Sequence, residues 1–486
     1  TRKSLLISII ESAFNKIQGV GSVKKLMIGL ISLLLLSIVL IGCNTQESNE
    51  NDTSSTDDHT STESDTTEDA NDSDEQVTIK FHTHGNEASY SWSETLAAFE
   101  EEYPNIKVDL IILSEKGDTN EALQKLDLAA SSGEQMDVLM FSDPASYAER
   151  VDLGMVAPID EFIEQEGFDV AEEYKVNTVL DGQYYALPGK FNPWYVLVNK
   201  DHLETAGLEM PTDWTWDEFA DYAKQLTTDD HYGTFFHGPQ NGGWMEYMKL
   251  ALASKPEETE FVKSDGTSNF EDPMFRKTLE LRWQMEKEDQ SATPYTDIMS
   301  QNLHYRDTFF NQDASLVLIG SWMNTELGGT DQFPLDFNVG VAPYPKNDAS
   351  DDGGYTPVTT DYMAVAANSE LKKEAYTFIR WYTTEGQVVQ GKNIPSWNGV
   401  DDSELENIID TILADTNNPE KVDKAALIDV LKNAKASKLI PPVSYQSEIY
   451  QMVNDEYEKL IYEEQNIDET VQSMHEKAED IIANNQ

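Results

Sequence analysis

The sequence has a single cysteine and few basic residues for its length. One cysteine among 486 residues excludes a disulfide within the chain and any metal site built from several cysteines. Lysine and arginine number 34 against 89 aspartate and glutamate residues, which gives a formal net charge of −55. Such a surface repels a phosphate backbone, so we expect no nucleic-acid partner.

The short signatures of several enzyme classes are also missing. The sequence contains no GxSxG elbow, no phosphate-binding glycine-rich loop with lysine, and no HExxH. Among so many acids some carboxylates lie near each other, as glycosidase chemistry requires. We therefore expect a protein that is not an enzyme and needs no cofactor, and an exported glycan-processing enzyme stays as an alternative.

The amino-terminal region carries the pattern of an export signal. Two lysines at 24 and 25 precede an uninterrupted apolar run, 26–41, which is followed by Gly42 and Cys43. This ending resembles the bacterial lipobox, so we predict a lipoprotein signal peptide over 23–42 and lipidation of Cys43. The alternative is a transmembrane anchor, but 16 apolar residues fall below the roughly 17–25 that span a bilayer.

Two further segments flank that signal. We expect residues 1–22 to be an upstream extension that is not normally translated, with Val23 encoded by a start codon; a long basic region before the apolar run is the alternative. Residues 43–76 form an acidic, Ser/Thr-rich stretch in which 44–76 contains 12 acids, no lysine or arginine and no aromatic residue. Such a composition cannot offset the entropy of ordering, so we predict a disordered tether.

From residue 77 onward the pattern is that of a folded α/β body. Strand-like segments alternate with helical ones: strands at 77–81, 106–113 and 136–141, helices at 92–103 and 121–130. Ser91 and Glu94 predict a capping box at the start of the first helix. The order favours a parallel sheet covered on both faces, whose ligands bind beyond the carboxyl ends of the strands. The loops at 82–90 and 141–147 are therefore the first candidates for a site.

Longer motifs resemble one known family. They occur in the family's order along most of 77–400: 100–108 (EEEYPNIKV), 133–138 (GEQMDV), 154–159 (GMVAPI), 181–188 (DGQYYALP), 198–201 (VNKD), 206–207 (AG), 215–219 (TWDEF), 310–322 (FNQDASLVLIGSW) and 339–345 (VGVAPYP). Together they resemble family 1 extracellular solute-binding proteins, the sugar-binding partners of ABC importers. The sequence departs from the family where Asn311 and Gln312 replace the usual glycine, and where 196–198 replaces a tyrosine-rich strand.

The resemblance implies a two-lobed α/β fold of the periplasmic-binding-protein type II, with a hinge and a binding cleft between the lobes. Carried over by motif position, lobe one comprises 77–190 plus 363–398. Lobe two comprises 191–362 plus 399–486, with a helix at 445–462 packed back on it. Two lobes agree with the two domains expected from the length of 486 residues.

Four tryptophans sit beside turn residues and are candidates for stacking on a sugar ring: Trp194, Trp244, Trp322 and Trp397. Trp322 also matches the family's tryptophan after a strand, which stacks on sugar in several members. Packing between the lobes is the alternative for the other three. Tyr450 lies near the position of another stacking aromatic in the family.

Polar candidates come from the ends of predicted strands and from the hinge. Asp143 follows the strand at 136–141 and is either a ligand contact or a helix cap. Asn192 and Asp361 lie on segments that cross or border the hinge. His84 and Asn86 are expected to reach the cleft as hydrogen-bonding groups.

Two clusters of residues have the types, but not the spacing, of metal sites. A zinc site at His82 and His84 is the alternative for that pair, but a third ligand is not evident, so we predict no metal. Asp348, Asp351 and Asp352 lack calcium-loop spacing, so a solvated hairpin is expected there.

The residues and the resemblance together predict a lipid-anchored solute-binding protein on the extracellular face of the cell membrane. It would capture a carbohydrate, an oligosaccharide in particular, as a monomer, and deliver it to a two-subunit permease with a separate ATPase. Lys190 is the only basic cleft candidate, which argues against a phosphorylated ligand. The alternative ligand is a polyamine or other cation, caged by Asp143, Asp361 and tryptophans. We attribute the surface acidity to a saline or alkaline habitat.

Overall fold

The computed structural model describes residues 76–485, apart from 243 and 439. The described residues belong to one compact unit. Several predicted segments lie outside the described residues: the extension at 1–22, the signal peptide at 23–42, Cys43 and all but the last residue of the tether. Within the described part of the chain, no helix combines the length and the apolar composition that a membrane crossing requires.

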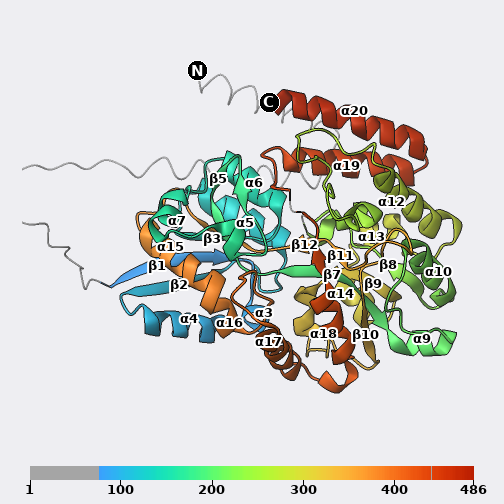
Figure 1. Cartoon of the computed structure of the whole chain (residues 1–486), viewed down its shortest axis with the longest axis horizontal. Helices are drawn as coiled ribbons and strands as arrows, with labels where there is room; N and C mark the ends of the chain where they lie inside the picture. Colours follow the sequence, from blue (N-terminus) through green and yellow to red (C-terminus); the bar gives the residue numbers. More distant parts are fainter. Residues whose placement is uncertain (1–75, 243, 439, 486) are drawn as a thin grey trace, which may run out of the picture. The chain divides into compact units, whose positions relative to one another are not determined.

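The first of two five-stranded sheets confirms the parallel arrangement expected for the start of the body. Its order is β2-β1-β3-β13-β6, in which β1 pairs in parallel with both β2 and β3 (Figure 1). Strand β13, from much later in the chain, pairs antiparallel with β3 and β6. The bounds are β1 Val77–Thr83, β2 Ile106–Ile112, β3 Val138–Phe141, β6 Ala186–Pro188 and β13 Tyr362–Val365.

Helices on the first sheet bury one apolar face each. Helix α4 (Trp92–Glu102) buries Trp92 and Phe99, and Phe99 packs edge-on against Phe378 with ring centroids 5.0 Å apart. Phe378 belongs to α15, which returns to this lobe beside β13. The helices of this lobe are α3 Glu87–Tyr90, α4, α5 Thr119–Ser131, α6 Pro144–Asp152, α7 Asp160–Glu166, α8 Val170–Glu173, α15 Lys372–Trp381 and α16 Gln387–Gln390.

The predicted capping box at Ser91 and Glu94 is wrong. Ser91 ends α3 and starts α4 with a left-handed backbone (φ 44°), and its side chain makes no cap hydrogen bond. The carboxylate of Glu87 accepts the hydrogen bond from the Ser93 N–H instead, at 3.1 Å. Because two helices meet at one residue, the backbone of Ser91 has to turn rather than cap.

The second sheet has the order β10-β7-β9-β8, with the short β12 also paired to β7. Strand β7 is buried along its whole length, as expected for a strand covered on both faces. Gln312, at the family's glycine position, has a left-handed backbone with φ 65°, the conformation that glycine adopts most readily. The bounds are β7 Asn192–Asn199, β8 Tyr232–Phe235, β9 Ala314–Gly320, β10 Val339–Ala342 and β12 Val358–Thr359.

The second sheet is covered by the larger of the helical layers, and the two sheets have separate hydrophobic cores. Helix α10 starts with a complete capping box between Thr215 and Glu218. The remaining bounds are α9 Lys200–Ala206, α10 Trp216–Leu226, α11 Leu250–Ala253, α12 Pro273–Trp283, α13 Tyr295–Gln301, α14 Tyr305–Phe310, α17 Asp402–Ala414, α18 Lys424–Asn433, α19 Gln446–Ile461 and α20 Ile467–Asn485; short strands are β4 Val179–Leu180, β5 Gln183–Tyr184, β11 Tyr355–Thr356 and β14 Lys435–Ala436.

Three chain segments run side by side where the lobes meet. The Gly189 N–H donates to the Asp361 carbonyl at 2.8 Å, and the Phe191 N–H donates to the Ile394 carbonyl at 2.7 Å. These bonds join the segments that leave β6, enter β13 and follow α16. The fold is thus a two-lobed α/β fold with crossing segments, while the residue boundaries given above for the lobes stay a prediction.

The helix expected at 445–462 is present as α19. Its buried side chains, including Val453 and Tyr457, belong to the core of the second lobe, as predicted. Its first turn also reaches the first lobe, where the Ser447 hydroxyl lies 3.4 Å from Glu149 of α6. Helix α19 therefore contacts both lobes on the side where α6 lies (Figure 1).

Candidate functional site

A cavity of about 510 Å³ lies between the lobes and is lined by residues from both. The first lobe contributes 84–90 after β1 and 116–121 before and within α5. The second lobe contributes 302–307 and the turn after β9, and the crossing segments supply the floor at 190–192 and 359–361. This is the position expected for a ligand site, beyond the carboxyl ends of the strands.

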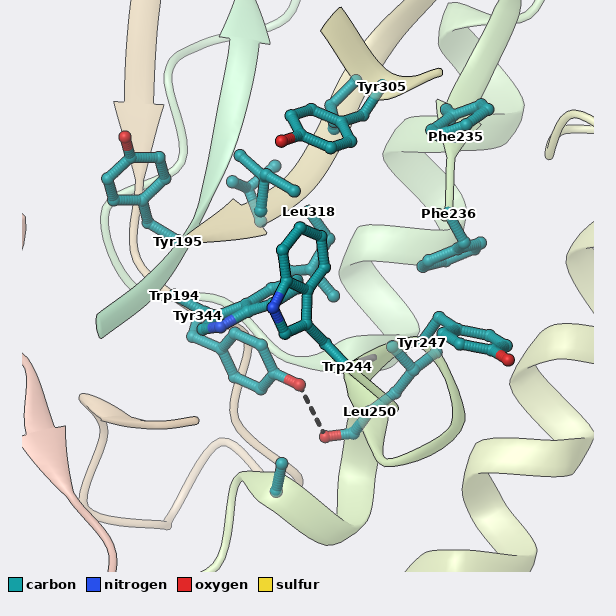
Figure 2. Packing of buried hydrophobic residues seen from close by; sticks show 14 of the residues in the cluster. Trp194, Tyr195, Phe235, Phe236, Trp244, Tyr247, Leu250, Tyr305, Leu318 and Tyr344 are labelled. Carbon is teal, nitrogen blue, oxygen red and sulfur yellow. Dashed lines mark hydrogen bonds between the residues drawn. The ribbon is translucent and has the colours of Figure 1, made fainter. Parts of the chain in front are cut away.

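The second lobe presents an aromatic wall to the cavity. Trp322 and Trp244 both line it, with ring centroids 4.7 Å apart and planes inclined by 34°. Tyr305 completes the wall, its hydroxyl accepting a hydrogen bond from the Trp322 indole N–H at 3.2 Å. Figure 2 shows Trp244 over Trp194, whose ring lies one layer deeper, next to the core of the second sheet. Flat rings held this way suit contact with the C–H face of a ligand.

A glycine lies behind Trp322, the central ring of this wall. A Cβ placed on Gly320 would overlap the six-membered ring of the Trp322 indole. The Gly-Ser-Trp sequence that ends β9 therefore allows the indole to fold back over its own strand. The position of Trp322 depends on the missing side chain at 320 as well as on its neighbours.

A buried polar cluster forms the other end of the cavity. Lys190 Nζ lies 3.1 Å from Asp361 Oδ2 and donates to the Tyr90 hydroxyl at 2.6 Å. Tyr90 in turn donates to Asp361 Oδ2 at 2.8 Å, and its oxygen lies 3.2 Å from His84 Nε2. Burial lowers the pKa of His84 to about 4, and burial together with Asp361 raises the pKa of Tyr90. His84 is therefore neutral at physiological pH.

A second ion pair lies beside the aromatic wall, and it corrects the expectation that Lys190 is the only basic residue of the cleft. Arg306 lines the cavity, donates to Glu326 at 2.6 Å through Nε, and donates to the Tyr305 hydroxyl at 2.7 Å through Nη1. Lys116 is also in the lining, at an exposed position. The two most buried cations of the cavity, Lys190 and Arg306, are each paired with a carboxylate.

Four buried polar atoms in the lining have no hydrogen-bond partner among the described residues. They are Thr119 Oγ1, Asn192 Nδ2, Asn241 Oδ1 and Asp361 Oδ1. Asn192 and Asp361 are both only 1% exposed. Buried polar atoms are normally paired, so unpaired ones that face a cavity indicate groups for a ligand or for water.

Six of the residues proposed from the sequence meet in this lining: His84, Asn86, Asn192, Trp244, Trp322 and Asp361. Asn86 also has a structural task. Its side chain caps α3 by accepting from the Ser89 N–H at 3.0 Å and donates to the Glu115 carbonyl at 3.1 Å. Whether any of them binds a ligand stays a prediction.

The other four candidates are not in the cavity lining. Trp194 lies beneath Trp322 and Trp244. Asp143 caps α6, where it accepts from the Ser146 N–H at 2.8 Å and from its hydroxyl at 2.6 Å, which is the alternative weighed above. Trp397 donates its indole N–H to Glu173 of α8 at 3.0 Å. Tyr450 packs edge-on against Phe261 in the core of the second lobe, with ring centroids 6.0 Å apart.

The two ionic alternatives find little support in the geometry. His82 lies 3.5 Å from Glu134, whereas His84 faces Tyr90 and Asp361, so their ring nitrogens have different neighbours. No group of three or more His, Cys, Asp or Glu side chains suited to a metal ion occurs among residues 76–485 as described. Asp348 and Asp351 bond to turn backbone at an exposed position, as expected of a solvated turn.

Sequence reasoning missed Tyr90, Asn241, Tyr305 and Arg306. Tyr90 ends the loop after β1 that was named as a candidate region, so its position could have been found. Tyr305 and Arg306 start α14, far from any predicted strand end, and carry no motif. Only the packing of α14 against β9 brings them to the cavity.

Comparison with known proteins agrees with this arrangement. The family described as "Bacterial extracellular solute-binding protein" matches residues 84–389. A binding protein of Brucella abortus (strain 2308) is 25% identical over 288 residues, 59% of this chain and 66% of that protein's length. The mannitol-binding protein of Pseudomonas aeruginosa is 23% identical, over 66% of this chain and 72% of that protein.

Solved structures share the fold. An ABC substrate-binding protein from Listeria monocytogenes, solved in complex with cycloalternan, superposes with a TM-score of 0.66 at 19% identity. The superposition covers 84% of this chain and 99% of that one.

Proposed function

Because the chain belongs to the family of bacterial extracellular solute-binding proteins, we propose that it captures a carbohydrate between its lobes and delivers it to an ABC-type permease. The permease would have two membrane subunits and a separate ATPase. The chain itself breaks no bond in this proposal. It acts as a monomer held at the extracellular face of the membrane by a lipid on Cys43.

The observation that carries the proposal is the pairing of flat rings with unpartnered polar atoms across one cavity. A sugar offers C–H faces and hydroxyl groups. Trp322 and Trp244 supply the rings, while Asn192 and Asp361 supply a hydrogen-bond donor and an acceptor that lack partners in the described structure. The cavity volume of about 510 Å³ lies in the range of small-molecule sites.

The charges of the cavity favour an uncharged ligand over the cationic alternative. Asp361, one of the two acids considered for holding an ammonium group, is neutralised by Lys190 at 3.1 Å. The other, Asp143, is used as the cap of α6. The relatives also favour an uncharged ligand, since one is named for binding mannitol and one structural neighbour was solved with cycloalternan.

We extend the proposal to an oligosaccharide because the lining has more residues than the aromatic wall and the polar cluster. Asn302 and Gln332 of the second lobe and Asp118 of the first also line the cavity. A ligand of several sugar rings would contact more of this lining than a single ring.

Capture would work by shifting a population of conformations. Residues of both lobes line the cavity, so a ligand that contacts both stabilises the closed arrangement over an open one. The crossing segments at 189, 191 and 361 are where the chain would bend. The permease would recognise the closed form.

The direct test is ligand binding by the full chain. The probes are maltose, maltotriose and D-mannitol, and the controls are spermidine and zinc. In thermal-shift and calorimetric measurements, only a sugar or polyol should raise the melting temperature. Chromatography of the bound sugar should recover it unchanged. A shift with spermidine or zinc alone, or hydrolysis of the sugar, would contradict the proposal.

The lipid anchor needs its own experiment. Mass spectrometry of the mature amino terminus should find a diacylated Cys43, and Cys43→Ser should release the protein from the membrane fraction. An unmodified Cys43 in membrane-bound protein would contradict the anchor and leave the binding proposal intact.

A further inference from the structure

The floor of the cavity holds one free acceptor and one free donor on two buried side chains. Asp361 Oδ1 and Asn192 Nδ2 have no hydrogen-bond partner among the described residues, although both side chains are 99% buried by the chain. Both residues lie on segments that cross between the lobes. A ligand enclosed by the two lobes would therefore meet these atoms at the hinge.

The backbone holds the two residues near each other. Asn192 opens β7 and pairs antiparallel with Thr359 of β12, two residues before Asp361. The carbonyl of Asp361 accepts the Gly189 N–H at 2.8 Å, three residues before Asn192. The strand pairing of Asn192 with Thr359 and the hydrogen bond between Gly189 and Asp361 thus tie the two chain segments together on either side of this pair.

The other polar atom of each side chain is already engaged, which fixes its orientation. Asp361 Oδ2 receives Tyr90 at 2.8 Å and lies 3.1 Å from Lys190 Nζ. Asn192 Oδ1 accepts the Ser321 hydroxyl at 3.2 Å. With Asn192 Oδ1 engaged in this way, the atom of Asn192 left without a partner is the amide nitrogen.

The chemistry of the two free atoms selects a hydroxyl group. A hydroxyl both donates, to Asp361 Oδ1, and accepts, from Asn192 Nδ2. An ammonium group could donate to Asp361 but would leave Asn192 unpaired and would lie near the Lys190 cation. A carboxylate could accept from Asn192 but would be repelled by Asp361.

We propose that Asp361 and Asn192 are the specificity-determining pair of the cavity, binding one hydroxyl or two neighbouring hydroxyls of an uncharged ligand and rejecting ammonium and carboxylate groups. Lys190 and Tyr90 are positioning residues that hold Asp361 for this task. This inference rests on the proposed function and adds to it the group that is recognised.

The test replaces the donor by an acceptor of the same size. Asn192→Asp turns the free N–H₂ into a carboxylate oxygen beside Asp361. Asn311→Asp is the matched control, because it adds the same charge at an exposed position outside the cavity lining. Calorimetry on the full chain uses maltose, maltotriose and D-mannitol as hydroxyl-bearing probes, spermidine as the cation and gluconate as the carboxylate.

We expect the unaltered chain to bind at least one hydroxyl-bearing probe and neither charged one. Asn192→Asp should weaken that binding about tenfold or more and strengthen binding of spermidine, while Asn311→Asp changes neither. Unchanged sugar binding in Asn192→Asp would overturn the pair and leave the proposed function standing. Binding of spermidine but no hydroxyl-bearing probe by the unaltered chain would overturn both.

A crystal structure of the unaltered chain with the bound probe decides the matter if Asn192→Asp fails to fold. We expect hydroxyl oxygens at about 3 Å from Asp361 Oδ1 and from Asn192 Nδ2. A ligand whose hydroxyls contact neither atom would overturn the pair.

Discussion

The indole of Trp322 rests edge-on against the indole of Trp194, with ring centroids 5.2 Å apart and planes at 85°. Trp194 is 1% exposed and Trp322 is half-buried, so one ring faces the cavity and the other supports it. Gly320, the partner of Trp194 across β7 and β9, leaves space for the Trp322 ring. An edge-to-face pair of this kind holds a ring in place at little entropic cost, which is what a preformed binding surface needs.

Trp322→Ala should weaken carbohydrate binding about tenfold or more, because truncating an enclosed aromatic contact commonly costs over about 1 kcal/mol. The measurement is calorimetry with whichever of maltose, maltotriose or D-mannitol binds the unaltered chain. Trp397→Ala is the matched control, since Trp397 is also half-buried but packs on Glu173 outside the cavity. Equal binding by the two variants would argue against the aromatic wall.

Gly320→Ala should displace the Trp322 ring and reduce binding without removing any aromatic group. The added Cβ would occupy the place of the indole, so the ring has to move. Tryptophan fluorescence and calorimetry should change together. Gly353→Ala, outside the cavity lining, is the control, because a Cβ there meets its nearest neighbour at an ordinary 3.6 Å. Unaltered fluorescence and binding in Gly320→Ala would contradict the packing.

The buried pair of Lys190 and Asp361 should behave as a unit in unfolding experiments. Asp361→Leu alone leaves a buried lysine without its carboxylate and should lower the free energy of unfolding by about 3–5 kcal/mol. The double variant with Lys190→Met should recover part of that loss, since both charges are then gone. Urea unfolding at pH 7 measures the unaltered chain, Asp361→Leu, Lys190→Met and the double variant. Strictly additive losses would show that the two groups do not interact.

Acid should destabilise the chain in part through His84. Its pKa falls from an ordinary 6.5 in the unfolded chain to about 4 in the fold, chiefly because it is buried. Above pH 6.5 the group is neutral in both states and has no effect. As the pH drops toward 4, the unfolded chain takes up a proton that the folded one rejects, which lowers the free energy of unfolding by about 3 kcal/mol.

His84→Gln removes that group and should flatten the pH dependence of unfolding between pH 6.5 and 4 by about the same amount. Urea unfolding of both proteins across this range is the measurement. If the free energy of unfolding falls equally with pH in both proteins, His84 takes up its proton in the folded chain as readily as in the unfolded one.

Salt should raise the melting temperature. With a net charge of −55 the surface repels itself, and raising NaCl from about 0.05 M to about 1 M shortens the Debye length to about 3 Å. Calorimetry over that series measures the gain. A melting temperature that is indifferent to both salt and pH would remove the link between the acidity and a saline or alkaline habitat.

Periodicity was enough to predict where strands and helices lie in the first lobe, but it did not show which way side chains turn at their ends. Asp143 and His84 both follow buried strands. The carboxylate of Asp143 turns back to the amide of Ser146, whereas His84 stays at the cavity because Tyr90 and Asp361 face it. The local sequence allowed Asp143 to be either a cap or a ligand contact and did not decide between them.

For the tryptophans too, local sequence does not show which ring faces the cavity, because tertiary packing decides it. Trp194 and Trp322 both stand beside turn residues, and only the antiparallel pairing of β7 with β9 places one ring beneath the other. Tyr305 and Arg306 reach the cavity from a helix with no site signal in its sequence. Such contacts join residues more than a hundred positions apart, which no window along the chain can detect.

The position of β13 also constrains how the chain can be made. In the first sheet, β13 (Tyr362–Val365) lies between β3 and β6, and β6 has no other partner in that sheet. During synthesis the ribosome releases β6 some 170 residues before β13. Until then β3 keeps an open edge, so a nascent or truncated chain that stops short of residue 362 would present that edge to chaperones, proteases or other copies of itself.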